Sequence, residues 1–148
     1  MKRIVLLALL AGMLTGCALG QTSAPPSPTA DATGGVAILF QRSGGLLPGD
    51  LQWAIYPDGR VVTGKGEEKS VTLDQVQALL AEIRLLGFFD LQDSYGLSSV
   101  CNDCYTYSIT VNDGGRVKTV IAVEGATDTP GTVLEIIGAI NTFLSSLP

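Results

Sequence analysis

The chain has 148 residues, which is enough for one folded domain and excludes two independent ones. Hydrophobic residues make up 46% of the chain and charged residues only 16%, which excludes an intrinsically disordered protein. There is no histidine, so the commonest general base and the commonest metal ligand are both missing. We therefore expect no enzymatic activity, no cofactor and no metal site.

The first seventeen residues have the order of an export signal: a basic pair at positions 2 and 3, an unbroken apolar run over 4–10, and small residues leading to Cys17. The apolar run is too short to cross the ~30 Å hydrocarbon core of a bilayer, so we expect residues 1–16 to be a signal peptide that is removed. Leu14-Thr15-Gly16-Cys17 resembles the bacterial lipobox. That resemblance implies a lipoprotein in which Cys17 is acylated, with palmitate for example, and becomes the new N-terminus.

The lipobox implies a protein held by lipid to the cell membrane on its extracytoplasmic side, since several acyl chains anchor far better than one. Ala18 stands where lipoproteins retained at the inner membrane carry Asp, so a host with an outer membrane could sort the protein there. The alternative is a soluble signal peptide with an unmodified Cys17. Residues 17–35 then form a flexible linker rich in Pro, Ser, Thr and Ala, which spans at most about 60 Å.

Charge excludes one class of partner. Removal of residues 1–16 takes away Lys2 and Arg3 and leaves 7 basic against 14 acidic side chains, a formal balance of −7. Such a surface is repelled by phosphate backbones, so we expect no nucleic-acid partner.

Regular patterns begin at residue 36 and predict a globular domain over 36–148. Strands are predicted at 36–41, 51–56 and 60–63, with Asp58-Gly59 supplying the tight turn between the last two. A helix is predicted from Thr72, which forms a capping box with Gln75, to Gly87.

The second half repeats this pattern. Strands are predicted at 105–111 and 117–123 around a turn at 112–115. Thr129-Pro130 then opens a helix whose apolar stripe is Val133, Ile136, Ile137, Ile140 and Leu144. The prediction is an α+β fold in which two tandem β-β-α units form one antiparallel sheet with two helices packed on one face.

Residues 36–148 also resemble a family of uncharacterised bacterial proteins that are secreted or lipid-anchored. The resemblance lies in the turn at 56–59, the helix exit Leu86-Gly87-Phe88-Phe89-Asp90-Leu91, Tyr95 and Lys118-Thr119-Val120. It supports the predicted fold and implies no catalytic residue. The chain departs from the family pattern at Cys101 and Cys104, where the pattern has an acidic or polar connection.

The pair Cys101 and Cys104 allows three interpretations. A structural disulfide fits an exported protein, because disulfides persist outside the cytoplasm. A thiol redox protein or sensor would need a low-pKa cysteine, typically at a helix N-terminus. A zinc site would have to recruit Asp93 or Asp103, or be shared across a dimer.

Several remaining residues are candidates for an interaction surface. The acids Asp90, Asp93 and Asp103 follow the first helix; they read as solvated loop acids, although calcium binding or paired-carboxylate glycosidase chemistry would use the same residue type. Strand alternation puts Tyr56 on the sheet face opposite Trp53, with Ala54, Thr106, Ser108 and Thr110, and this face is either simply solvated or a contact patch. The candidate interaction residues are Tyr56, Asp90, Asp93, Tyr95 and Asp103.

These patterns together predict a membrane-anchored lipoprotein that acts as a non-enzymatic interaction or envelope-associated module. Its partners would be the membrane, through the lipid, and an envelope protein or glycan. The alternative is an extracytoplasmic thiol redox protein that uses Cys101 and Cys104.

Overall fold

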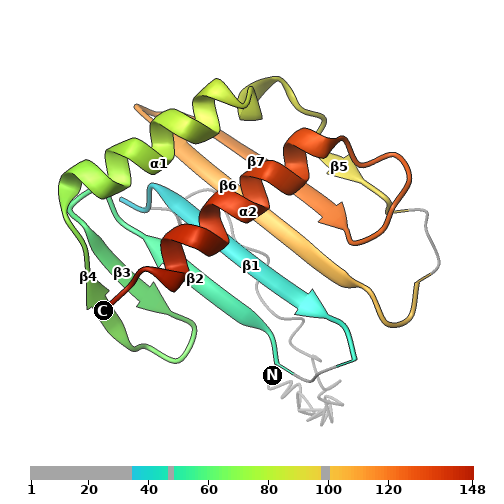
Figure 1. Ribbon diagram of the computed structural model, residues 1–148, viewed down its shortest axis with the longest axis horizontal. Coiled ribbons are helices and arrows are strands. Elements are labelled where there is room, and N and C mark those ends of the chain that lie inside the picture. The colour runs from blue at the N-terminus through green and yellow to red at the C-terminus, as the bar shows by residue number, and fades with distance from the viewer. Residues whose placement is uncertain (1–34, 47–48, 98–100) are drawn as a thin grey trace, which may run out of the picture.

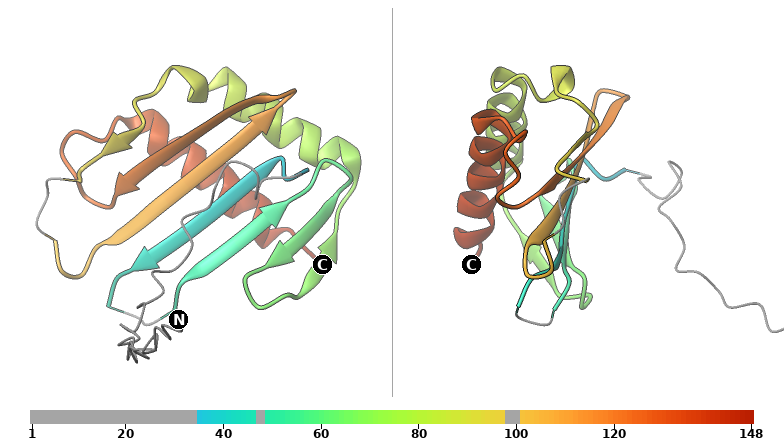
Figure 2. Two further views of the ribbon diagram at one scale, coloured as in Figure 1. Left: turned by 180° about the vertical axis from the view of Figure 1, so that it is seen from behind. Right: turned by 90° about the vertical axis from the view of Figure 1, so that its right-hand side faces the viewer.

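A computed structural model describes residues 35–46, 49–97 and 101–148 of the chain. These residues form one seven-stranded sheet with two helices packed on the same face, an α+β fold in two layers (Figures 1 and 2). The strand order across the sheet is β4-β3-β2-β1-β6-β7-β5. The elements in chain order are β1 (Ile38–Gly44), β2 (Leu51–Ile55), β3 (Arg60–Thr63), β4 (Glu68–Ser70), α1 (Leu73–Leu85), the 3₁₀ turn η2 (Phe88–Asp90), β5 (Ser94–Tyr95), β6 (Tyr105–Asp113), β7 (Arg116–Val123) and α2 (Gly131–Ser145).

The two halves of the chain meet at the centre of the sheet, where β1 pairs antiparallel with β6 from Ile38 opposite Val111 to Gly44 opposite Tyr105. The long hairpin of β6 and β7 turns at Gly114 and Gly115, whose φ angles are 61° and 90°. A two-residue hairpin loop of type I′ needs positive φ at both positions, and glycine adopts it without strain.

The predicted turn at Asp58-Gly59 is confirmed and also fixes the entry to α1. The Val71 N–H donates to the Gly59 carbonyl oxygen at 2.9 Å, and a Cβ at position 59 would collide with the Val71 carbonyl oxygen. Only glycine can therefore occupy this position without moving the chain that leads into the first helix.

The sheet differs from the prediction in two ways. It is mixed and not purely antiparallel, because β5 pairs parallel with β7 through Ser94 and Tyr95. The tandem β-β-α arrangement is not confirmed either, since four strands precede α1 while β6 and β7 alone lie between β5 and α2. The added strands β4 and β5 have three and two residues, too short to show the alternation by which strands are recognised in a sequence.

Both helices begin close to the predicted positions. The capping box is confirmed: Thr72 Oγ1 accepts from the Gln75 N–H and the Gln75 side chain accepts from the Thr72 N–H. The second helix starts one residue later than predicted, with Pro130 as its N-cap residue. Among the described residues, neither helix is long and apolar enough to cross a membrane.

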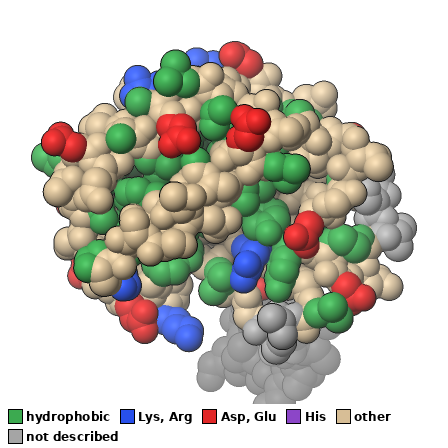
Figure 3. All heavy atoms as spheres, viewed as in Figure 1, with side chains coloured by type: hydrophobic (Ala, Val, Ile, Leu, Met, Phe, Trp, Pro, Cys, Tyr) green, Lys and Arg blue, Asp and Glu red, His purple; other side chains and the backbone are tan. Residues whose placement is uncertain are grey.

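The core lies between the helices and the sheet. Strand residues Ile38, Ile55, Ile109 and Val111 are at most 1% exposed, and they contribute to the same cluster as the buried stripes of α1 and α2. Hydrophobic side chains remain visible between the two helices from outside (Figure 3). The side chains on this face of the sheet therefore form the core and stabilise the fold.

Candidate functional site

The opposite face of the sheet carries no helix in the described part of the chain (Figure 2). Successive strand side chains point to opposite faces, so the residues that alternate with the buried ones line this surface. We call it the helix-free face; it consists of Leu39, Gln41, Gln52, Ala54, Tyr56, Arg60, Val62, Thr106, Ser108, Thr110, Thr119 and Ile121. Polar pairs join its neighbouring strands, with Gln41 Nε2 donating to Gln52 Oε1 at 3.0 Å and the hydroxyls of Thr110 and Thr119 2.8 Å apart.

The predicted residue Tyr56 lies on the helix-free face, near the β4 edge of the sheet. The guanidinium of Arg60 stacks over its ring at 3.5 Å from the centroid and also forms an ion pair with Glu68 at 3.4 Å. Tyr56 is half-buried.

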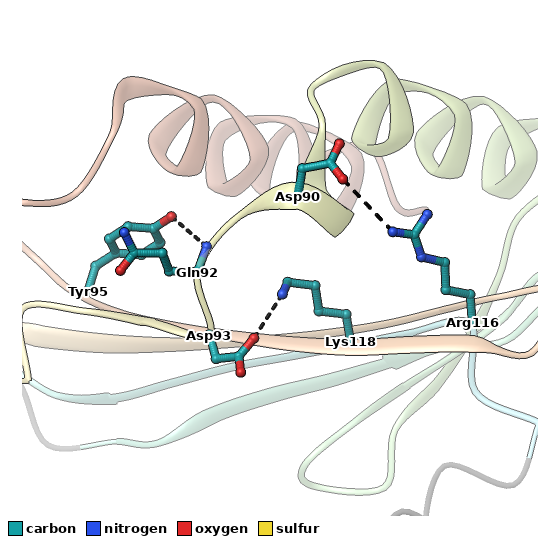
Figure 4. A network of polar contacts seen from close by, with 6 residues as sticks. All are labelled: Asp90, Gln92, Asp93, Tyr95, Arg116 and Lys118. Atoms are coloured by element: carbon teal, nitrogen blue, oxygen red, sulfur yellow. Dashed lines mark hydrogen bonds and ion pairs between the residues drawn. The ribbon is translucent and has the colours of Figure 1, made fainter.

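The predicted acids Asp90 and Asp93 lie elsewhere, on the segment from η2 to β5 that arches over β7 (Figure 4). Asp93 Oδ1 accepts from Lys118 Nζ at 2.8 Å, and Asp90 Oδ1 lies 4.0 Å from a nitrogen of Arg116. Arg116 also stacks on Phe89 at 4.4 Å from the ring centroid. An open recess of about 540 Å³ lies between this segment and β7, and Asp93 is the acid that lines it.

Two predicted residues are placed differently from the rest. Tyr95 is only 6% exposed, and its hydroxyl accepts from the Gln92 N–H at 2.9 Å, so it is part of the core and not of an interaction surface. Asp103 is exposed but precedes β6, at the end of the sheet away from Arg116. At about 3.3 Å per residue, the length of β7 separates that end from Asp90 by roughly 25 Å. The structure therefore does not bring the three acids together.

Cys101 and Cys104 are joined by a disulfide with a Cα–Cα distance of 5.5 Å. The bridge lies just before β6, where the Cys104 carbonyl oxygen accepts from the Gly45 N–H at 3.2 Å. Neither cysteine stands at the start of α1 or α2, the position typical of a thiol redox site. No group of three potential metal ligands of the Cys, Asp and Glu type occurs among the described residues.

Sequence reasoning missed one cluster on the helix side of the sheet, at the end of β1. The guanidinium of Arg42 lies 4.4 Å from the ring centroid of Tyr105, and its buried Nε has no hydrogen-bond partner in the described part of the chain. Burial raises the pKa of the neighbouring Tyr107 hydroxyl, the charge of Glu124 raises it further, and Arg42 lowers it. The signal was available, because Arg42 continues the inward alternation of Ile38 and Phe40.

Comparisons of the chain with protein-family models, with curated proteins and with solved structures found no match. The resemblances noted in the sequence, including the lipobox, thus stay predictions. Cys17 and residues 1–34 lie outside the described residues.

Proposed function

We propose that the chain is an exported lipoprotein, anchored through acylated Cys17 on the extracytoplasmic side of the membrane, whose domain over residues 36–148 binds an envelope protein. The order of basic residues, apolar run and lipobox supports the anchor. The linker that follows Cys17 supports a domain that stands clear of the membrane surface.

The helix-free face is the observation that carries the binding proposal. Hydroxyl and amide side chains such as Ser108, Thr110 and Gln41 alternate there with the half-buried apolar side chains of Leu39 and Ile121. A broad sheet surface of this mixed character can form hydrogen bonds and bury apolar area against a protein of complementary shape. The domain then acts by contact and not by turnover.

The anchor is tested by phase separation in a detergent that clouds on warming. We expect the wild-type chain to enter the detergent phase and to incorporate an acyl label, since its lipid is hydrophobic. The Cys17→Ser variant should carry no label, and it should either enter the aqueous phase or accumulate with its signal peptide uncleaved. A labelled Cys17→Ser chain, or an unlabelled wild-type chain in the aqueous phase, would contradict the anchor.

Binding is tested separately by adding the Cys17→Ser chain to isolated envelopes that lack the native protein. We expect saturable binding that Ser108→Arg weakens at least tenfold, because a charged side chain on the helix-free face blocks close contact. Asn141→Arg introduces the same charge on the exposed side of α2 and should have no effect. Equal loss in both variants, or no saturable binding, would refute the proposal. Binding that survives protease treatment of the envelopes would indicate a glycan in place of a protein.

A further inference from the structure

Within residues 35–46, 49–97 and 101–148, the outer edge of β7 is unpaired over most of its length. The strand runs from Arg116 to Val123, but β5 pairs with it only at Ile121 and Ala122. No other strand in the described part of the chain covers the stretch from Arg116 to Val120, which we call the β7 edge. An unpaired edge of this kind is a template for another strand.

The hydrogen bonds of β7 show which of its backbone groups point away from β6. Ile121 donates its N–H outward, to the Asp93 carbonyl oxygen at 2.9 Å, whereas Glu124 donates inward, to the Tyr105 carbonyl oxygen at 2.8 Å. Direction alternates along a strand, so Val117 and Thr119 point their N–H and C=O groups outward. The close hydroxyl pair of Thr110 and Thr119 agrees with this assignment. Side chains approach most closely at opposite residues that exchange no backbone hydrogen bonds, so the backbone groups of Thr119 point away from β6.

The surroundings of the β7 edge leave room for a peptide. The recess of about 540 Å³ runs along this edge, and the arch from η2 to β5 stands over its helix side (Figure 4). Arg116 and Lys118 line that side, and Val117 and Thr119 line the other. An extended peptide placed here would direct alternate side chains under the arch and toward the helix-free face.

Charge in the recess indicates what kind of side chain fits. Lysine on an edge strand often blocks pairing, but Lys118 is bound to Asp93 and its side chain is only 18% exposed. Arg116 is 65% exposed and its contact with Asp90 is long, at 4.0 Å, so this pair contributes little. The guanidinium of Arg116 can therefore donate hydrogen bonds to a second, better-placed carboxylate.

We propose that the β7 edge binds an extended peptide segment of a partner protein, which adds a strand to the sheet and places an acidic side chain opposite Arg116. This inference deepens the proposed binding function and rests on it. A second copy of the chain fits less well, because antiparallel pairing of two β7 edges about their centre puts Lys118 opposite itself. The main-chain hydrogen bonds of Val117 and Thr119 would supply affinity, and Arg116 would supply selectivity.

The test selects peptides from a phage-displayed library of random octapeptides against the full chain in mild detergent. We expect enriched peptides rich in β-branched residues with an Asp or Glu. Val117→Pro should weaken their binding at least tenfold, because it removes an outward N–H while leaving the hydrogen bonds to β6 intact. Val117→Ala is the matched control and should change binding less than threefold. Amide hydrogen exchange at positions 117 and 119 should slow at least tenfold when peptide is bound.

Three results would overturn the inference: no enrichment, equal binding to the Val117→Pro and wild-type chains, or self-association of the chain that Val117→Pro abolishes. The thermal unfolding midpoint of Val117→Pro must stay within a few degrees of the wild type. Thr119→Pro removes the other outward N–H and tests peptide binding independently. If envelope binding depends on Ser108 while both proline variants bind envelopes and peptides normally, the β7 edge inference fails and the proposed function stands.

Discussion

The two faces of the sheet are built from the same strands and differ in the side chains they bury or expose. In β6, Ile109 is 1% exposed and packs in the core, while its neighbours Ser108 and Thr110 lie half-buried on the helix-free face. One face buries apolar side chains against two helices, and the other displays hydroxyl and amide groups. Burial in the core and exposure to solvent are separated by single-residue alternation along each strand, so variants one position apart should act on different properties.

The largest effect is expected on the helix-covered face. Ile109→Ala should lower the free energy of unfolding by about 2–5 kcal/mol, because it removes buried methylenes and leaves a cavity. Ser108→Ala, one residue away, should stay within about 0.5 kcal/mol. Urea unfolding followed by circular dichroism measures both. Equal losses would show that the helix-free face is also packed.

The next effect concerns the disulfide, which closes a loop of four residues at the start of β6. Chain-entropy arithmetic for so short a loop gives about 2 kcal/mol of stabilisation. The Cys101→Ser and Cys104→Ser double variant should unfold at correspondingly lower denaturant concentration and keep its envelope binding. Titration of the wild-type chain against glutathione buffers distinguishes a structural disulfide from a redox-active one. A mildly oxidising potential would indicate a reactive pair, and resistance to reduction would indicate a structural pair.

Loss of the capping box should have a smaller effect on stability, because it concerns only the first turn of α1. Thr72→Ala removes the acceptor for the Gln75 N–H and should cost about 1 kcal/mol. Thr72→Ser keeps the hydroxyl and should recover most of that loss. Thermal unfolding of the two variants provides the measurement, and an equal loss in both would contradict the role given to the hydroxyl.

The smallest effect is expected at Tyr107, where the helix-covered face becomes accessible to solvent at the end of the sheet. Burial and Glu124 raise the pKa of its hydroxyl, so the folded state favours the neutral phenol. The resulting stabilisation is complete below the ordinary tyrosine pKa and is lost as the pH rises through the raised value. Tyr107→Phe should show less alkaline loss of stability than the wild type between pH 9 and pH 11, in unfolding measured at several pH values.

Much of this fold could be predicted because its signals are local. Alternation identified the long strands, and the Thr72–Gln75 capping box located the first helix directly. The short strands β4 and β5 could not be recognised, because pairing with β3 and β7 defines them and their own residues do not. The order of strands across the sheet likewise depends on contacts far apart in sequence.

The candidate site was less predictable, since it depends on which residues the sheet brings together. Asp90, Asp93 and Asp103 are close in the sequence, but the length of β7 separates Asp90, beside Arg116, from Asp103, which precedes β6. Tyr95 is predicted to be an interaction residue, but its pairing with Ala122 in the sheet places it in the core. Alternation in β1 places Arg42 on the inner face, but it does not identify Tyr105 as the partner, because the two strands lie far apart in the sequence.

The central claim, that the helix-free face is a protein-binding surface, is tested most directly by photo-cross-linking in living cells. A photoreactive amino acid replaces Ser108 on that face or, as a control, Asn141 on the exposed side of α2. The account predicts one discrete protein adduct of higher mass from position 108 and none from position 141. The same adducts from both positions, or none from position 108 in correctly anchored chains, would contradict it.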